Sequence, residues 1–257
     1  MNLENDLQRI EQALTLARKA VAKYTPGRID ADRKAGGDPV TAADLELDEL
    51  LKQTLRIDGD GWLSEETRDD PSRLQKHRVW IVDPIDGTKE FIQGIPEWCT
   101  SVGLAIDGKV VAGGICNPQA DQLIIGVAGA GVTMNGKPVK TTDKDTVEGA
   151  TVLASRSEIK RGEWDRFMDG PLKVIPSGSV AYKLAAIAAG LADATFTLVP
   201  KNEWDIAAGV ALIEAAGGRT MEKQGGPLTF NNSNTLITGM IATGPNLFEP
   251  LRQYLGF

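Results

Sequence analysis

Residues 80–88 read Trp80-Ile81-Val82-Asp83-Pro84-Ile85-Asp86-Gly87-Thr88, an apolar run that leads straight into two aspartates. The residues before the first aspartate predict a buried strand over 79–82. Burying carboxylates at the end of such a strand is costly unless another group compensates their charge. Pro84 stiffens the turn because its ring fixes φ, and Thr88 is expected to cap a short helix over 88–93. This segment therefore predicts a rigid acidic turn.

The spacing of the two aspartates suggests a cation site. Asp83 and Asp86 could both face one ion, and the carbonyl oxygen of Ile85 could supply a third ligand. A ligand set made only of oxygen favours a hard cation, which in the cytosol is Mg²⁺. A capped turn, in which Asp86 accepts hydrogen bonds from backbone amides, explains the same residues. From this segment alone, both interpretations stay open.

Other acidic positions allow the same two interpretations. Glu65 and Glu66 follow a short strand at 62–63, where a solvated loop is the ordinary explanation. Asp44 and Asp205 stand in the first turns of helices, where an acid interacts favourably with the helix dipole. Taken one at a time, none of these acids indicates a site.

The segments around the acidic turn predict a mixed α/β chain. Amphipathic helices are expected over 4–24 and from Thr41 or Asp38 to Arg56, with a loop over 27–39 between them. Hairpins are expected at Asp107-Gly108 and Asn135-Gly136. After residue 150, strands alternate with helices, which is typical of a layered α/β structure. The expected strands are 151–155, 172–176, 193–198, 219–221 and 237–243, and the expected helices are 162–168, 180–190, 204–216 and 245–255.

A polar stretch over 141–149 suggests where the chain divides. We expect an N-terminal α+β half over 1–148, which carries most of the candidate metal ligands. A C-terminal α/β half over 149–257 would carry Asp205 and the substrate-side residues. Homodimer formation through the β-rich block before residue 148 is one alternative, and the oligomeric state stays open.

Composition excludes several classes of function. The 257-residue chain has 28 Lys and Arg against 35 Asp and Glu, a net charge of −7, which disfavours a nucleic acid polymer as partner. No apolar run reaches the ~20 residues of a membrane span, and the polar segment 1–9 does not resemble an export signal. We therefore expect a cytoplasmic protein with no membrane partner.

The rare residue types narrow the chemistry further. Cys99 and Cys116 are the only cysteines, stand in apolar surroundings and are expected to be buried. His77 is the only histidine and lies in a polar stretch, so a Ser-His-Asp triad or a histidine-rich zinc site is disfavoured. Chemistry is left to carboxylates, hydroxyls, basic side chains and oxygen-bound metal.

Taken together, four segments resemble the motifs of the inositol monophosphatase family, a group of Mg²⁺-dependent, lithium-sensitive phosphatases. They follow the order and spacing of that family across nearly the whole chain. The segments are Asp38-Pro-Val-Thr-Ala-Ala-Asp44, Leu63-Ser-Glu65-Glu66, Trp80 to Thr88, and Trp204-Asp-Ile-Ala-Ala-Gly209 with Ala216-Gly-Gly218 after it. The resemblance implies a layered αβαβα sandwich of the sugar-phosphatase type and hydrolysis of phosphomonoesters.

The resemblance also implies roles for single residues. Glu65, Asp83 and the Ile85 carbonyl would hold one Mg²⁺, and Asp83, Asp86 and Asp205 a second, within a set of two or three ions. Glu66 is a secondary candidate. The implied catalytic residues are Asp44, Thr88 and Glu65, with Thr88 and Asp44 orienting the attacking water. The amides of Gly87 and Thr88 would bind the phosphate, as helix N-termini do.

Two features resemble the 3'(2'),5'-bisphosphate nucleotidase branch of that family. Lys89-Glu90-Phe91 follows the Asp-Gly-Thr motif, and Lys183 matches a lysine of the branch. Leu198 stands where inositol phosphatases carry a glutamate, and leucine cannot accept a hydrogen bond from a polyol. We therefore expect removal of the 3'-phosphate from adenosine 3',5'-bisphosphate to give AMP, with Ser155, Arg156, Ser179 and Lys183 binding the substrate.

One position departs from the nucleotidase pattern. The branch has Ser-Arg-Ser-His where this chain has Ser-Arg-Ser-Glu158, which leaves recognition of adenine and the 5'-phosphate open. Simpler explanations also exist for Lys183, as a surface lysine, and for Arg156, in a surface salt bridge with Glu158 or Asp165. The alternative functions are an inositol-1-monophosphatase or broad sugar phosphatase, and a non-catalytic protein that binds metal or phosphate.

Overall fold

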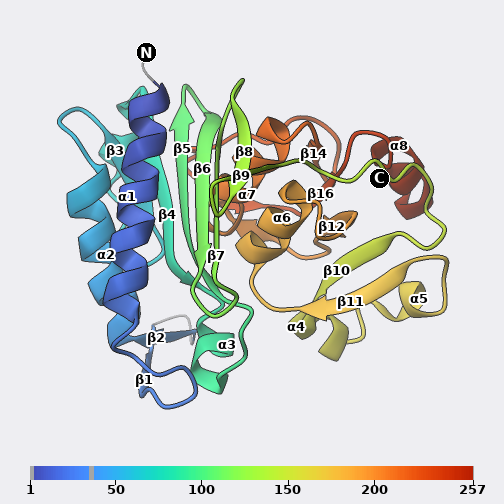
Figure 1. Cartoon of the computed structure of the whole chain (residues 1–257), viewed down its shortest axis with the longest axis horizontal. Coiled ribbons are helices and arrows are strands. Elements are labelled where there is room, and N and C mark those ends of the chain that lie inside the picture. Colours follow the sequence, from blue (N-terminus) through green and yellow to red (C-terminus); the bar gives the residue numbers. More distant parts are fainter. Residues whose placement is uncertain (1–2, 35–37, 257) are drawn as a thin grey trace.

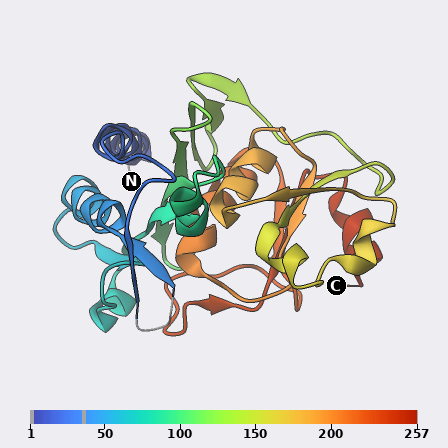
Figure 2. The same ribbon diagram turned by 90° about the horizontal axis from the view of Figure 1, so that it is seen from below.

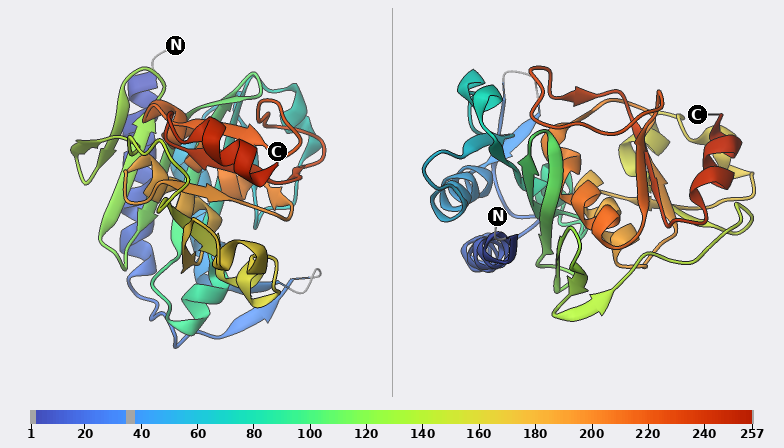
Figure 3. Two further views of the ribbon diagram at one scale, coloured as in Figure 1. Left: turned by 90° about the vertical axis from the view of Figure 1, so that its right-hand side faces the viewer. Right: turned by 90° about the horizontal axis from the view of Figure 1, so that it is seen from above.

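The computed structural model describes residues 3–34 and 38–256, which form layers in the order helix, sheet, helix, sheet, helix (Figure 1). Helices α1 (Leu3–Val21) and α2 (Ala42–Leu55) cover one face of a seven-stranded sheet. Helices α6 (Val180–Ala188) and α7 (Glu203–Ala215) lie between this sheet and a five-stranded sheet (Figure 2). The outer face of the second sheet carries α8 (Phe248–Leu255), far from α1 (Figure 3). The αβαβα prediction is confirmed.

The larger sheet is formed by consecutive strands, all antiparallel except for its first pair. Asp107-Gly108 and Asn135-Gly136 each close a hairpin, as expected, and all four of these turn residues have positive φ. The strands in spatial order are β3 (Gly61–Ser64), β4 (Arg78–Asp86), β5 (Cys99–Ile106), β6 (Lys109–Asn117), β7 (Gln122–Val127), β8 (Gly131–Met134) and β9 (Lys137–Val139).

The smaller sheet combines parallel and antiparallel pairs. Its order is β11 (Lys173–Ser177), β10 (Thr151–Ser155), β12 (Ala194–Phe196), β16 (Met240–Thr243) and β14 (Arg219–Glu222). The prediction of one strand over 237–243 is wrong, because Gly239 with φ +140° separates two strands. The first of them, β15 (Leu236–Ile237), pairs instead with β13 (Lys201–Asn202). This small β13–β15 pair leads directly into α7.

Short elements account for the other differences from the predicted pattern. The expected loop over 27–39 contains β1 (Ala31–Arg33) and the start of β2 (Pro39–Thr41), while its residues 35–37 lie outside the described part. The expected helix over 162–168 is helical only in α5 (Asp165–Met168), since Gly162 adopts φ +79°. Two further short helices, α4 (Arg156–Lys160) and the 3-10 helix η1 (Pro71–Gln75), were not predicted from the sequence.

The middle helix layer is packed unusually closely. A Cβ atom at Gly209 of α7 would lie 2.3 Å from the Cβ of Leu184 in α6, and one at Gly113 would lie 2.5 Å from the Ala208 carbonyl oxygen. Glycine at both positions therefore lets α7 approach α6 and the larger sheet. This packing brings the first turn of α7 beside the end of β4, where the acidic motif lies.

Two further predictions can be checked at this level. Cys99 and Cys116 are buried thiols without a disulfide, as expected. Within the described ranges, no helix is both long and apolar enough to cross a membrane. The division at 148/149 stays a prediction; α6 and α7, from the second half, pack on the sheet of the first.

Candidate active site

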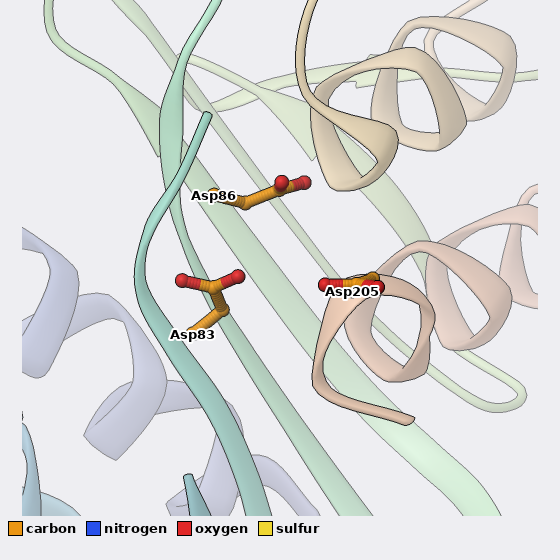
Figure 4. Close-up of side chains that lie close together, drawn as sticks. All are labelled: Asp83, Asp86 and Asp205. Atoms are coloured by element: carbon orange, nitrogen blue, oxygen red, sulfur yellow. The ribbon is translucent and has the colours of Figure 1, made fainter. Parts of the chain in front are cut away.

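The acidic motif and α7 bring three carboxylates together. Strand β4 continues through Asp86, and its register against β5 shifts between Asp83 and Asp86. Asp205 comes from the first turn of α7. One oxygen of each carboxylate lies within 4.8 Å of the others, and Figure 4 shows the three side chains around one space. The fold therefore gathers residues that the sequence separates by more than a hundred positions.

Within the described residues, one carboxylate of this cluster lacks a hydrogen-bond partner. Asp83 is 1% exposed, and neither of its carboxylate oxygens has a hydrogen-bond partner among the described residues. Burial raises the pKa of Asp83, and the negative charges of Glu65 and Asp86 raise it further. Burial likewise raises the pKa of Asp205 to about 8, again with the help of neighbouring carboxylates. An orphaned carboxylate in an all-oxygen cluster fits a hard cation such as Mg²⁺.

Asp86 has partners that hold its side chain in place. Its Oδ2 accepts hydrogen bonds from the Ala181 amide at 2.5 Å and from the Ser179 hydroxyl at 2.8 Å. Burial raises the pKa of Asp86, and these hydrogen bonds oppose the rise. The alternative interpretation, a carboxylate that accepts hydrogen bonds from backbone amides, is thus partly right for Asp86. It does not apply to Asp83.

Glu65 and Glu66 border the cluster. Glu65 lines the same cleft as Asp83 and is close enough to raise the pKa of that residue. The Lys34 ammonium lies 2.7 Å from a Glu65 oxygen and 2.6 Å from a Glu66 oxygen. Burial raises the pKa of Glu66 to about 7 although Lys34 opposes the change. A lysine thus neutralises these two acids in part, whereas no lysine of the described residues contacts Asp83.

Thr88 and Asp44 meet at the end of β4. The Thr88 hydroxyl lies 3.1 Å from the Ile85 carbonyl oxygen and 3.3 Å from Asp44 Oδ1. Asp44 is fully buried, and its Oδ2 accepts hydrogen bonds from the amide and hydroxyl of Thr41, the N-cap of α2. Asp44 Oδ1 is therefore aimed at Thr88.

Thr88 does not cap a helix, so that prediction is wrong. The N-cap of α3 (Thr88–Gln93) is Gly87, and Thr88 is the first helical residue. Gly87 has φ +97°, and a Cβ atom there would lie 3.1 Å from the Glu97 carbonyl oxygen. Only glycine suits this position, and the left-handed turn leaves the Thr88 hydroxyl directed at Ile85 and Asp44.

The candidate substrate residues line a cleft of about 400 Å³ that also contains the carboxylates. Lys183 is only 2% exposed and donates to the Ser179 carbonyl oxygen at 2.8 Å, so its interpretation as a surface lysine is wrong. Burial lowers the pKa of Lys183 to about 8, although the charge of Asp86 opposes this. A buried ammonium therefore stands in the same cleft as the acidic cluster.

The serine and arginine candidates have structural partners. Ser155 is the N-cap of α4. Arg156 forms a two-pronged ion pair with Glu97, at 2.7 and 2.6 Å, so the alternative explanation, a salt bridge with Glu158 or Asp165, is wrong. Sequence reasoning missed Lys201, which lines the cleft from β13. The sequence around Lys201 is a short polar segment, and nothing in it indicates that this lysine lines the cleft.

The fold and this carboxylate cluster fit one class of protein, the metal-dependent phosphatases. The model of the inositol monophosphatase family matches residues 3–254, and the chain belongs to this family. The family acts on small phosphorylated substrates and typically requires Mg²⁺. The predicted family resemblance is thereby confirmed.

Named relatives support the assignment. An inositol-1-monophosphatase of Mesorhizobium japonicum is 32% identical over 212 residues, which cover 79% of each chain. The solved inositol monophosphatase of Anabaena (Nostoc) has a TM-score of 0.82 at 26% identity and covers 100% of this chain and 97% of its own. CysQ of Bacteroides thetaiotaomicron, described as a bacterial member of the family, has a TM-score of 0.78 at 27% identity and covers 95% and 98%.

Proposed function

We propose that this phosphatase removes the 3'-phosphate from adenosine 3',5'-bisphosphate and releases AMP and inorganic phosphate. The observation that carries the proposal is the pairing, in one cleft, of a carboxylate cluster with the buried ammonium of Lys183. The cluster suits the phosphate that reacts, since it can hold cations. The positive charge of Lys183 beside the cluster favours a substrate that carries a second anionic group.

The metal ligands belong to this proposal. Two or three Mg²⁺ ions would be held by Glu65, Asp83, the carbonyl of Ile85, Asp86 and Asp205. When bound, Mg²⁺ supplies positive charge that neutralises the phosphate oxygens and lowers the pKa of water. The amides of Gly87 and Thr88 at the start of α3 would bind phosphate oxygens. Ser155, Arg156, Ser179 and Lys183 would bind the rest of the substrate.

Thr88 and Asp44 would orient the attacking water. Thr88 has one hydroxyl proton and two acceptors within reach, Asp44 Oδ1 and the Ile85 carbonyl oxygen. With that proton donated to either acceptor, the lone pairs of Oγ1 remain to accept a hydrogen bond from water. Water held in this way has its own lone pair available for attack on phosphorus.

Hydrolysis of inositol 1-phosphate is the second candidate, favoured by the name of the Mesorhizobium relative. Leu198 argues against it. That side chain packs against the core between the smaller sheet and α8, so it presents no acceptor to a polyol. A third candidate, a non-catalytic protein that binds metal or phosphate, is disfavoured because all the acids and the threonine of the motifs are present.

A phosphate-release assay tests the proposal. With Mg²⁺, kcat/KM should be at least about tenfold higher for adenosine 3',5'-bisphosphate than for inositol 1-phosphate. EDTA should abolish release, and Li⁺ should inhibit it. Asp86→Asn should remove activity, whereas the exposed control Asp145→Asn should keep it. Equal rates on both substrates contradict nucleotide specificity, and no release from either contradicts the enzyme assignment.

A further inference from the structure

A buried ion pair lies in the wall of the cleft. Glu158 of α4 is fully buried, and its Oε2 accepts a hydrogen bond from the Trp164 indole at 2.9 Å. Its other oxygen, Oε1, lies 3.1 Å from the Lys201 ammonium and has no hydrogen bond within the described ranges. A buried carboxylate without a cation costs several kcal/mol. Glu158 therefore holds the Lys201 side chain in a defined position.

Lys201 keeps more N–H donors for a ligand than the buried Lys183 does. Arg156 uses its Nε and Nη2 groups on Glu97. Lys183 is almost fully buried and directs its ammonium at backbone carbonyl oxygens. The Lys201 side chain is 14% exposed and has one ion-pair contact, to Glu158. Since an ammonium has three N–H donors, at least two of them remain for a group in the cleft.

Lys201 also lies near both parts of the site. It stands in β13, directly before the helix that carries Asp205. Burial raises the pKa of Asp205 and lowers the pKa of Lys183. The positive charge of Lys201 has a smaller effect and lowers both pKa values. Lys201 also lines the same cleft as Asp205 and Lys183. One small molecule in this cleft can therefore present its reacting phosphate to the carboxylate cluster and a second anionic group to Lys201.

We propose that Lys201 binds the second anionic group of the substrate and that Glu158 positions it. This inference rests on the proposed function, in which that group is the 5'-phosphate of the nucleotide. It gives a role to the position where the nucleotidase motif departs from its pattern. Glu158 carries no positive charge that could bind an anion. It instead holds the Lys201 ammonium, which comes from a distant segment of the chain, at the cleft.

Two adenosine substrates test the inference. Adenosine 3'-monophosphate has the same reacting phosphate as adenosine 3',5'-bisphosphate but lacks the 5'-phosphate. Lys201→Gln should raise KM for the bisphosphate about tenfold, change kcat by less than about threefold, and leave the constants for the monophosphate nearly unchanged. Glu158→Gln keeps an oxygen for the Trp164 indole and should raise the same KM by a smaller factor. Lys160→Gln, on the exposed side of α4, is the matched control and should change neither substrate.

A second pair of measurements covers folding and binding without turnover. Because Lys201→Gln leaves Glu158 buried and unpaired, the double variant with Glu158→Gln removes both charges and should melt near the wild-type temperature. It should show the same selective rise in KM. By calorimetry with Mg²⁺, the product AMP should bind this variant about tenfold more weakly than the wild type, while adenosine binding stays unchanged.

Three outcomes would overturn the inference. An equal loss on both adenosine substrates places Lys201 at the reacting phosphate instead. An unchanged KM in both Lys201 variants shows that it makes no contact with the substrate. If the wild type turns over both adenosine substrates with equal kcat/KM, the 5'-phosphate is not recognised and the inference fails, whereas the proposed function fails only if the bisphosphate is not preferred over inositol 1-phosphate. Wild-type rates on the two adenosine substrates and on inositol 1-phosphate therefore separate the two failures.

Discussion

Single hydroxyl and carboxylate groups join segments that are distant along the chain. Thr88, at the end of the acidic motif, meets Asp44 in the first turn of α2. The Asp44 carboxylate is fixed from the other side by Thr41, which leaves only one of its oxygens for Thr88. A threonine held in this way keeps hydroxyl lone pairs for a water molecule, which is the role proposed for it above.

Substituting Thr88 tests this at the level of the residue. Thr88→Val keeps the shape of the side chain and removes the hydroxyl, so kcat should fall by about 10²–10⁴-fold, the range typical of positioned proton-transfer groups. Initial rates at saturating Mg²⁺ measure the effect, and a thermal melt checks the fold. Thr88→Ser retains the hydroxyl and should stay within about tenfold of the wild type. Equal rates for the valine variant and the wild type would contradict the proposed role.

At the level of elements, a buried arginine ties the two sides of the site together. Arg73 of η1 is 1% exposed and donates to Asp69, to the Asn231 side chain and to the Asn232 carbonyl oxygen. The same two asparagines donate backbone amides to Glu203, the first residue of α7. The loop that carries Glu65 is thereby connected to the turn that carries Asp205.

Removing that connection should destabilise the protein and loosen the metal site. Arg73→Met should lower the free energy of unfolding by about 2–3 kcal/mol, since it removes several charge-assisted hydrogen bonds. It should also raise the Mg²⁺ concentration needed for half-maximal activity, with little change in kcat at saturation. Denaturant unfolding and an Mg²⁺ titration measure the two effects.

Lys140→Met provides the control for the arginine variant. The Lys140–Asp143 pair has side chains that are 72% and 70% exposed, and losing it should cost less than about 0.5 kcal/mol. If both variants have the same stability and the same Mg²⁺ requirement, the connection through Arg73 has no role in placing the acids.

For the whole molecule, the acidic cluster should link stability to pH. Burial and mutual repulsion raise the pKa values of Asp83, Asp86 and Asp205, that of Asp205 to about 8. Between the usual aspartate pKa of about 4 and these raised values, the native state binds more protons than the unfolded state. The free energy of unfolding therefore falls as pH rises through this window.

In EDTA, we expect the melting temperature to fall between pH 5 and pH 8, and saturating Mg²⁺ should reverse most of the loss at pH 8. Differential scanning calorimetry measures both trends. Asp83→Asn removes one charge of the cluster, so its metal-free melting temperature should depend less on pH and respond less to Mg²⁺. Identical pH profiles for this variant and the wild type would show that the cluster does not cause the dependence.

Local patterns in the sequence were enough for much of the architecture. Helical periodicity predicted α1 and α2, and Asp-Gly and Asn-Gly pairs predicted two hairpins, because these signals depend on residues a few positions apart. The acidic motif could be recognised from its order and spacing. Weak local signals failed: three-residue polar strands such as β1 have no periodicity, and Gly239 breaks one apolar run into strands of two different sheets.

Burial and partner choice, in contrast, depend on packing between distant elements. The sequence alone explained Lys183 equally well as a surface lysine. For Arg156 it offered ion-pair partners that are closer along the chain than Glu97, the partner that the structure shows. The pairing of Glu158 with Lys201 arises only because α4 and β13 meet at the cleft. A helix or a turn is encoded within a few residues, whereas the desolvation of a charge and the identity of its counter-ion are set by close packing of the layers.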